Sequence, residues 1–226
     1  MSHSKRYTAA SEKVDKDKAY EIREAVELLK SLPTTKFDQS VDLVLKLGVD
    51  PKQSDQAIRG SVVLPKGTGK KVRVVAFCQG GDVEAALAAG AIAAGAEELI
   101  AKVEGGWMDF DVAIAASELM GKVGKLGRVL GPKGLMPAPK SGTVTKEVPK
   151  TVAEFVGGKV EYRTDAGGNV HVPVGKVSFA TEDLVANIDA LIHRIETSRP
   201  SSTKGIFIEK IVLNSSMGPG IKLKVA

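Results

Sequence analysis

The chain has 226 residues, enough for one large domain or two small ones. Lys and Arg (32) outnumber Asp and Glu (27), so the net charge is +5, and the hydrophobic share of 43% is ordinary for a globular protein in water. One cysteine excludes an internal disulfide framework, and no apolar run approaches the ~18 residues of a membrane span. The polar residues 1–18 do not resemble a secretory signal, so we expect a cytoplasmic protein.

The first third of the chain predicts one helix and two strands. An apolar stripe at helical spacing predicts a helix over 19–32, which Pro33 ends. Hydrophobic residues at every second position from 41 to 49 predict a half-buried strand that turns Lys46 toward solvent or a partner. A second strand is expected over 58–64.

An α/β pattern follows in the middle of the chain. The glycine- and lysine-rich connector at 65–71 indicates a domain boundary. Continuous apolar runs at 72–78 and 111–116 predict buried parallel strands. Two helices, the second over 96–103, are expected between these strands, and Ser117 is expected to cap the N-terminus of a third helix.

The last third returns to alternating strands. Strands are predicted at 159–163 and 170–179, and the glycine-rich residues 165–169 between them predict a hairpin turn. Apolar residues at spacings of three and four predict an amphipathic helix over 181–197, and a final strand is expected at 205–213. The two ends of the chain therefore indicate α+β structure around an α/β middle.

A nucleotide-dependent enzyme is the first alternative that the residues raise. Gly80 and Gly81 lie between a strand and a helix, but neither a G-x-G-x-x-G nor a P-loop pattern is present, so they are interpreted as ordinary turn residues. Cys78 ends an apolar strand and is expected to be a buried, inert thiol. Asp109 and Asp111 alternate along a strand and allow acid–base chemistry, although a solvated strand end is the simpler interpretation. No metal or cofactor is expected, since the three histidines lack ligand spacing.

The segment from Gly121 to Lys146 concentrates the positive charge of the chain. It has no Asp or Glu, and its basic residues outnumber the whole net charge of +5, so the remainder of the chain is close to neutral. Six glycines and three prolines accompany them, as expected of a stiff loop whose backbone approaches phosphates closely, although a solvated basic loop is the alternative. The segment lacks aromatic residues for base stacking, so folded RNA or a duplex is favoured over a single strand. Its six basic residues are Lys122, Lys125, Arg128, Lys133, Lys140 and Lys146.

Five motifs resemble one known family in their order along the chain. They are KFDQSVDLVLKLGVDPKQSDQAIRG (36–60), GGWMDFDVAIA (105–115), KLGRVLGPKGLMPAPKSGTV (125–144), HVPVGKVSF (171–179) and SSMGPG (215–220). Together they resemble the L-one family of large-subunit ribosomal proteins, which form the mobile lateral stalk of the ribosome, in its bacterial form. The long central motif is the most specific of the five.

The resemblance implies two domains, the first of them discontinuous. Residues 1–66 and 159–226 would form domain I, an α+β domain with a split sheet and two helices that is the main RNA binder. Residues 67–158 would form domain II, an inserted α/β Rossmann-like three-layer domain that carries the basic glycine-rich loop. Two short linkers would join the domains and allow a hinge motion.

The resemblance also implies which side chains contact RNA. Lys36, Arg163 and Lys176 would meet phosphates, Phe37 and Met217 would supply apolar contact, the serines would reach 2′-hydroxyls and Gly218 would allow close approach of the backbone. From the residues alone, Phe37 is equally compatible with the core and His171 with a structural role. The implied rRNA- and mRNA-binding residues are Lys36, Phe37, Arg163, His171, Lys176, Ser178, Ser216, Met217 and Gly218, and the implied secondary contacts are Lys125, Arg128, Lys133 and Lys140.

The function implied by the resemblance is structural and regulatory, and it is not enzymatic. The protein would bind 23S rRNA at the stalk, assist release of deacylated tRNA from the E site, and repress translation of its own operon by binding its mRNA. It would act in the cytoplasm without a membrane partner and without a cofactor, as a monomer when free. Two features depart from the family pattern: Lys210, where some relatives carry a small hydroxyl residue, and the less basic turn 165–167.

Overall fold

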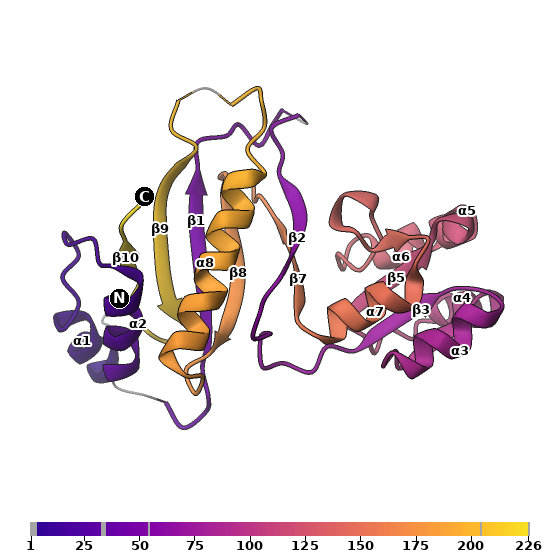
Figure 1. Ribbon diagram of the computed structural model, residues 1–226, viewed down its shortest axis with the longest axis horizontal. Coiled ribbons are helices and arrows are strands. Elements are labelled where there is room, and N and C mark those ends of the chain that lie inside the picture. The colour runs from indigo at the N-terminus through magenta and orange to yellow at the C-terminus, as the bar shows by residue number, and fades with distance from the viewer. Residues whose placement is uncertain (1–3, 33–34, 54, 204, 226) are drawn as a thin grey trace. The chain divides into compact units, whose positions relative to one another are not determined.

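The computed structural model describes residues 4–32, 35–53, 55–203 and 205–225 (Figure 1). The chain separates into two compact units, one formed by residues 1–69 and 160–226 and the other by residues 70–159. Each unit has its own buried hydrophobic residues.

A four-stranded antiparallel sheet forms the centre of the first unit. Its strands are β1 (Ser40–Leu47), β8 (Asn169–Lys176), β9 (Ile208–Ser215) and β10 (Ile221–Leu223), in the order β10-β9-β1-β8. The predicted alternation of β1 is confirmed, because Val41, Leu43, Leu45 and Leu47 are fully buried while the residues between them are partly exposed. β10 was not predicted, since it has three residues and is a strand only through its pairing with β9.

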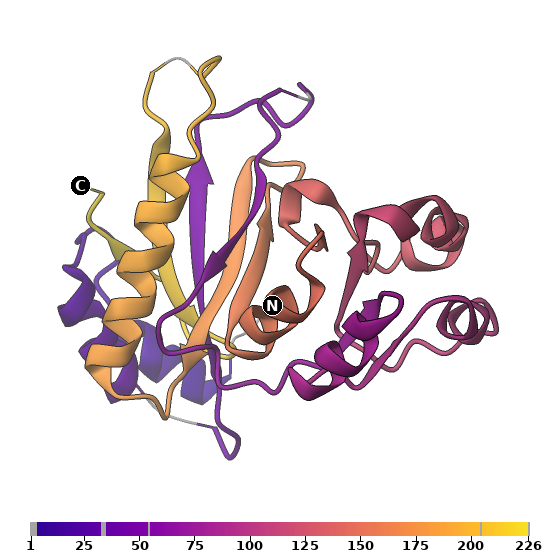
Figure 2. The ribbon, with the colours of Figure 1, turned by 45° about the vertical axis from the view of Figure 1, so that its right-hand side comes forward.

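Helices pack on one face of this sheet. α8 (Thr181–Thr197) has the predicted bounds and buries Leu184, Ile188, Leu191 and Ile195, and it crosses the sheet in both views (Figures 1 and 2). α2 (Ile22–Ser31) contacts α8, and the predicted stop at Pro33 lies outside the described residues. A third helix, α1 (Lys5–Glu12), adds to the two that were expected; it was missed because its sequence has no continuous apolar stripe.

The hairpin predicted around 165–169 is limited to its turn and one antiparallel bridge, between Thr164 and Val170. The turn itself exists, since Asp165 N–H donates to Asn169 O at 2.8 Å. However, β7 (Lys159–Arg163) pairs with β2 (Arg59–Val63) in a separate two-stranded sheet, while β8 pairs with β1. The strands diverge because the alternating apolar residues of β8 bury against α8, which draws β8 into the larger sheet.

The second unit contains a parallel sheet in the order β4-β3-β5-β6. The strands are β3 (Val74–Phe77), β4 (Ala93–Gly95), β5 (Val112–Ala116) and β6 (Val144–Thr145). β4 was not predicted, because Ala-Ala-Gly has little strand preference and pairs only through the register of β3.

Helices cover both faces of this parallel sheet. Val74 and Ile114 belong to a cluster with α3 (Gly81–Ala88) and α7 (Val148–Val156). Val75 and Phe77 belong to a second cluster with α4 (Glu97–Glu104) and the helical turns that follow β5. Since neighbouring residues of one strand point to opposite faces, the two clusters lie on opposite sides of the sheet.

The basic segment is partly helical. It contains α5 (Met120–Val123), the 3₁₀ helix η2 (Gly124–Leu126), α6 (Gly127–Leu130) and the 3₁₀ helix η3 (Pro139–Ser141). α5 lies in the helix predicted after Ser117, whereas the helical turns that follow it correct the prediction of a loop. Val123, Leu126 and Leu130 are fully buried, so burial of an apolar stripe overrides the low helix preference of glycine.

Ser117 does not act as the expected N-cap; it begins η1 (Ser117–Leu119), and its side chain makes no capping bond.

The connector between the units is held by a buried asparagine of α8. Asn187 is fully buried and accepts a hydrogen bond from Lys66 N–H at 3.0 Å, while its amide donates to Gly67 O at 2.9 Å and to Val174 O at 2.8 Å. Residues 66–69 therefore belong to the first unit, whereas the sequence placed the change after residue 66. In the described parts of the chain, no helix is long and apolar enough to cross a bilayer.

Candidate nucleic-acid interface

The sheet of the first unit has one face that the buried side chains leave open. Along β1 the partly exposed positions are Ser40, Asp42, Val44 and Lys46, which alternate with the buried ones. Strand register places His171 beside Val44 and Lys210 beside Lys46. This open face therefore carries cationic side chains around a half-buried carboxylate; burial raises the pKa of Asp42, although His171 and Lys176 oppose the shift.

Three segments far apart in the chain meet at one end of the open face. β1 begins where β8 and β9 end, because Ser40 pairs with Lys176 and Val41 pairs with Ser215. Residues 36–40, 176–178 and 215–218 are thus neighbours, and we call them the end cluster. Seven of the nine predicted primary contacts belong to the end cluster: Lys36, Phe37, Lys176, Ser178, Ser216, Met217 and Gly218.

Hydrogen bonds fix the backbone of the end cluster. Ser216 N–H donates to Ser40 O at 3.1 Å, and Ser40 N–H donates to Ser216 Oγ at 3.2 Å. The side chain of Gln39 is buried, and its Oε1 accepts Met217 N–H at 2.9 Å. The turn 215–218 is therefore anchored to the start of β1 by both backbone and side-chain bonds.

Two apolar side chains of the end cluster remain in solvent. Phe37 is 52% exposed and Met217 is 51% exposed, so the core alternative for Phe37 is wrong. The anchored backbone holds both side chains out before any partner arrives, which reduces the entropy lost on binding. Large exposed apolar side chains in a polar surrounding are typical of an interaction surface.

The polar residues of the end cluster differ in how free they are. Lys176 Nζ donates to Ser40 Oγ at 3.1 Å, and Ser178 Oγ donates to Asp38 Oδ2 at 2.8 Å. Lys36 is exposed and makes no ion pair within the described residues. Gly218 lies so close to Ser215 that a Cβ atom there would be 2.3 Å from Ser215 Oγ.

Arg163 and His171 lie outside the end cluster. His171 is exposed in mid-strand, and its Nε2 is 3.3 Å from Asp165 Oδ2. Arg163 is exposed on β7, which belongs to the two-stranded sheet. Asp165 is held as a carboxylate, since bonds from Asn169, Gly167 and His171 keep its pKa well below its usual value.

The four predicted secondary contacts are all exposed on the second unit. They lie on η2, α6, the turn 131–134 and η3, and none makes an ion pair among the described residues: Lys125, Arg128, Lys133, Lys140. Lys122 differs, because its ammonium lies 2.6 Å from Glu97 Oε1. One of the six cations of the segment is thus neutralised locally.

The second unit also has the crevice in which a nucleotide-dependent enzyme of this topology would bind its ligand. A cavity of about 210 Å³ follows the carboxyl ends of β3 and β5 and is lined by Asp82, Glu118 and Lys146. Two carboxylates against one ammonium disfavour a phosphate there.

Burial is the main reason that the pKa of Cys78 is raised, which supports the expectation of an inert thiol. Within the described residues, no group of three His, Cys, Asp or Glu side chains is placed to hold a metal ion.

Several residues of this surface were missed by the sequence analysis. Asp38 and Gln39 position the end cluster, and Arg6 of α1 donates to Met217 O at 3.0 Å. Lys210 and Lys222 lie on the open face of β9 and β10. The alternation of apolar and polar residues over 208–215 could have predicted that Lys210 lies on the exposed face of its strand. No local sequence pattern predicts the contact of Arg6 with residue 217.

Comparison with known proteins decides the family. The model of the ribosomal protein L1p/L10e family matches residues 28–219, which include every predicted contact. The chain belongs to the ribosomal protein L1p/L10e family. It is 52% identical over 225 residues to "Large ribosomal subunit protein uL1" of Clavibacter michiganensis subsp. michiganensis and, equally, of Clavibacter sepedonicus, covering all of this chain and 99% of each relative. Membership of the L1p/L10e family makes the chain a ribosomal protein and not an enzyme.

Proposed function

We propose that the chain is an RNA-binding protein of the large subunit of the cytoplasmic ribosome, and that its end cluster is the main contact with 23S rRNA of the mobile stalk. The observation that carries the proposal is the exposed pair Phe37 and Met217, held by an anchored backbone beside Lys36 and Lys176. The names of the two relatives support the subunit, and the cationic open face supports an anionic partner.

The end cluster combines the contacts that RNA recognition needs. Lys36 and Lys176 neutralise phosphates, and Phe37 and Met217 pack against bases or riboses exposed by the RNA fold. The hydroxyl of Ser216 lies at the surface and can reach a 2′-hydroxyl, which distinguishes RNA from DNA. The close packing of Gly218 on Ser215 keeps this edge flat enough for the backbone to approach.

The rest of the molecule has auxiliary roles in this proposal. His171 and Arg163 lengthen the contact away from the end cluster, and the basic segment of the second unit adds phosphate contacts. The inserted unit, with helices on both faces of a parallel sheet, is assigned to the Rossmann-like three-layer class. As part of the stalk, the protein assists release of deacylated tRNA from the E site, and it represses its own operon through the same end cluster on its mRNA.

The test compares the end cluster with the basic segment. Met217→Asp places a carboxylate against RNA and is expected to weaken binding to a stalk RNA fragment by at least about 30-fold, or about 2 kcal/mol. Replacing Lys125, Arg128, Lys133 and Lys140 together by alanine is expected to weaken it less. Substitution is preferable to deletion of the segment, because Leu126 and Leu130 are part of the core. Filter binding measures both affinities.

The matched control is Ile206→Asp, which adds the same charge to another exposed apolar side chain of the first unit. Its affinity for the fragment should stay within about twofold of the parent chain. Equal affinities of Met217→Asp and the parent chain would refute the end cluster as the main contact. A larger loss in the fourfold alanine variant would move the main contact to the second unit.

A further inference from the structure

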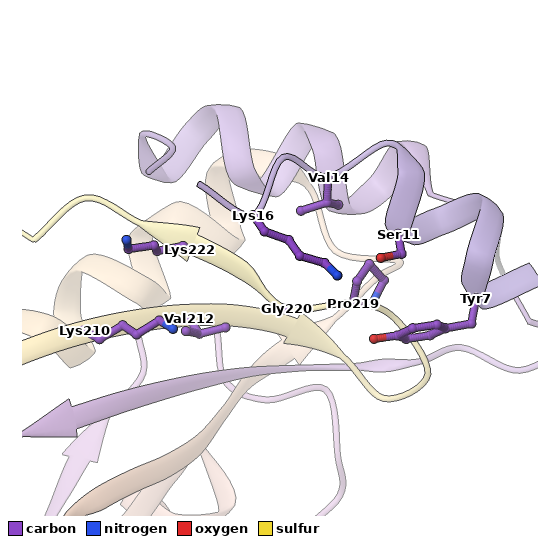
Figure 3. Close-up of a pocket in the computed structure, with 9 residues that line it drawn as sticks. All are labelled: Tyr7, Ser11, Val14, Lys16, Lys210, Val212, Pro219, Gly220 and Lys222. Carbon is purple, nitrogen blue, oxygen red and sulfur yellow. The ribbon is translucent and has the colours of Figure 1, made fainter. Parts of the chain in front are cut away.

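A cavity of about 310 Å³ lies in the first unit beside the end cluster (Figure 3). One wall comes from α1 and the residues after it, with Tyr7, Ser11 and Lys16. The other wall comes from β9, β10 and the turn between them, with Lys210, Pro219 and Lys222. Its size is at the low end of the ~300–1,000 Å³ typical of ligand pockets, which suits a small polar group.

The cavity is cationic and its lining contains no carboxylate. Lys16, Lys210 and Lys222 make no ion pair with any described residue, whereas Lys18 and Lys224, which lie close to them in sequence, pair with Glu24 and Glu21 at 2.5 and 2.6 Å. Two lysines next to the cavity in sequence are thus neutralised by a carboxylate, and the three that line it are not. Three lysine side chains line this space without a carboxylate, so its local charge is positive and attracts an anion.

The orientation of the side chains suits an anion in this cavity. Figure 3 shows the ammonium end of Lys16 directed toward Pro219 and that of Lys210 lying beside Val212. Lys222 pairs in register with Val212, so it emerges from the same face of the sheet, although its ammonium points the other way along β10. A four-carbon stem with rotatable bonds lets it turn inward on binding. The Ser11 hydroxyl can donate to an anion from the α1 side.

The cavity is continuous with the end cluster. Pro219 directly follows the turn that carries Met217 and Gly218, and Arg6 joins α1 to that turn through its 3.0 Å bond to Met217 O. Lys210 lies on the open face beside Lys46. An RNA strand that covers Met217 would therefore reach the cavity without leaving the surface.

We propose that this cavity is a phosphate-binding subsite for the backbone of the RNA that covers the end cluster, with Lys16, Lys210 and Lys222 as its cationic ligands. The inference rests on the proposed function, because it takes the RNA at Met217 as given. It adds α1 and β10 to the interface, and it assigns a role to the lysine at position 210.

The test removes the three lysines and follows the salt dependence of RNA binding. The variant Lys16→Ala/Lys210→Ala/Lys222→Ala should bind the stalk RNA fragment at least about tenfold more weakly, with a shallower slope of log affinity against log salt, by about one for each lost phosphate contact. The control Lys52→Ala/Lys71→Ala/Lys102→Ala removes the same charge from exposed positions outside the cavity and outside α1 and β10. The control should keep its slope and bind within about threefold of the parent chain.

A second measurement identifies the ligand as a phosphate of the RNA. A series of RNA fragments is made, each with one neutral methylphosphonate linkage at a different position. At one position the neutral linkage should lower the RNA affinity of the parent chain but not that of the cavity variant, which is the coupling expected of a direct contact. Additive losses at every position, or equal losses in the cavity variant and the control, would overturn the subsite. Binding of inorganic phosphate that depends on the three lysines, without any effect of these lysines on RNA affinity, would also overturn it by assigning the cavity to a free anion.

Loss of RNA affinity in Met217→Asp together with an unchanged RNA affinity of the cavity variant would refute the subsite alone. Failure of the parent chain to bind the fragment would refute the proposed function.

Discussion

Single side chains inside the end cluster decide what it presents. Gln39 is buried at the base of the cluster, and its bond to Met217 N–H fixes the backbone of a residue whose side chain is 51% exposed. Arg6 holds the carbonyl of the same residue from the opposite side. Met217 is therefore fixed at both its backbone groups, which explains how an apolar side chain stays exposed in the absence of a partner.

Gly218 offers a prediction at this scale. In Gly218→Ala the new Cβ would lie 2.3 Å from Ser215 Oγ, so either the Ser215 hydroxyl or the turn must move. Ser215 is buried, so we expect the turn to move and RNA affinity to fall by about tenfold. The conflict is with one hydroxyl oxygen, since Ser215 Cβ is 3.6 Å away. Filter binding with the stalk RNA fragment measures the loss.

The double variant Ser215→Ala/Gly218→Ala is the control for this explanation. Removing the hydroxyl oxygen opens the space that the new methyl group needs, and affinity should recover to within about threefold of Ser215→Ala alone. No recovery would mean that the methyl group of Gly218→Ala hinders the RNA itself and does not disturb the turn.

The elements act through the order in which they pair. β1 lies between β8 and β9, so residues 40, 176 and 215 come together at one end of the sheet although they are far apart in the chain. In the second unit, Asp111 joins the starts of β3 and β5. Its carboxylate accepts bonds from Lys70 Nζ at 2.9 Å and from Arg73 N–H at 3.1 Å.

Asp111 predicts a pH-dependent stability of the second unit. The bond from Lys70, followed by the bonds from Arg73, lowers the pKa of Asp111 to about 2. A folded pKa below the unfolded value of about 3.9 stabilises the unit above about pH 4, and this stabilisation is lost as the pH falls toward about 2. Asp111→Asn should therefore lower the free energy of unfolding by about 1 kcal/mol at pH 7, after solvent screening of the exposed cations, and by much less near pH 2.

Trp107, the one tryptophan of the chain, lies in the second unit and reports its unfolding in urea by fluorescence. Glu98→Gln is the control, since Glu98 is exposed and makes no ion pair with the described residues. A difference between Asp111→Asn and the parent chain that is as large at pH 2 as at pH 7 would contradict this role of the carboxylate.

At the scale of the whole molecule, two units share one chain that passes from the first to the second and back. The outward passage is anchored by Asn187, whose amide uses both donors and its acceptor on backbone groups of Lys66, Gly67 and Val174. Every polar group of this contact is satisfied, so its loss would leave three backbone groups without a partner.

Asn187→Ala should release the connector before the first unit unfolds. Cleavage by trypsin at Lys66 is expected to become about 30-fold faster, since two bonds to residues 66 and 67 are lost at about 1 kcal/mol each. Limited proteolysis with mass spectrometry of the first product measures the rate.

Leu191→Ala is the matched control for the connector. It removes a fully buried side chain from the same helix and destabilises the first unit, but it leaves the bonds to 66 and 67 intact. Equal acceleration in both variants would mean that the cleavage follows global stability and that Asn187 does not hold the connector.

The sequence predicted the features that depend on neighbours along the chain. The alternation of β1, the bounds of α8 and the exposed basic residues of 121–146 follow from local periodicity and charge. It failed where a partner distant in sequence decides: at β4, at β10, at the pairing of β7 with β2, and at the glycine-rich residues 124–130, which burial makes helical.

The sequence by itself therefore determined the family and predicted the residue types of the proposed RNA contacts, because motif order and side-chain chemistry are written in the chain. Only the tertiary structure decided that Phe37 is exposed, that Arg6 reaches Met217, 211 positions away, and that lysines from three segments surround one cavity. The reason is physical: these contacts depend on strand register and on helix packing, which bring together residues that no local pattern relates.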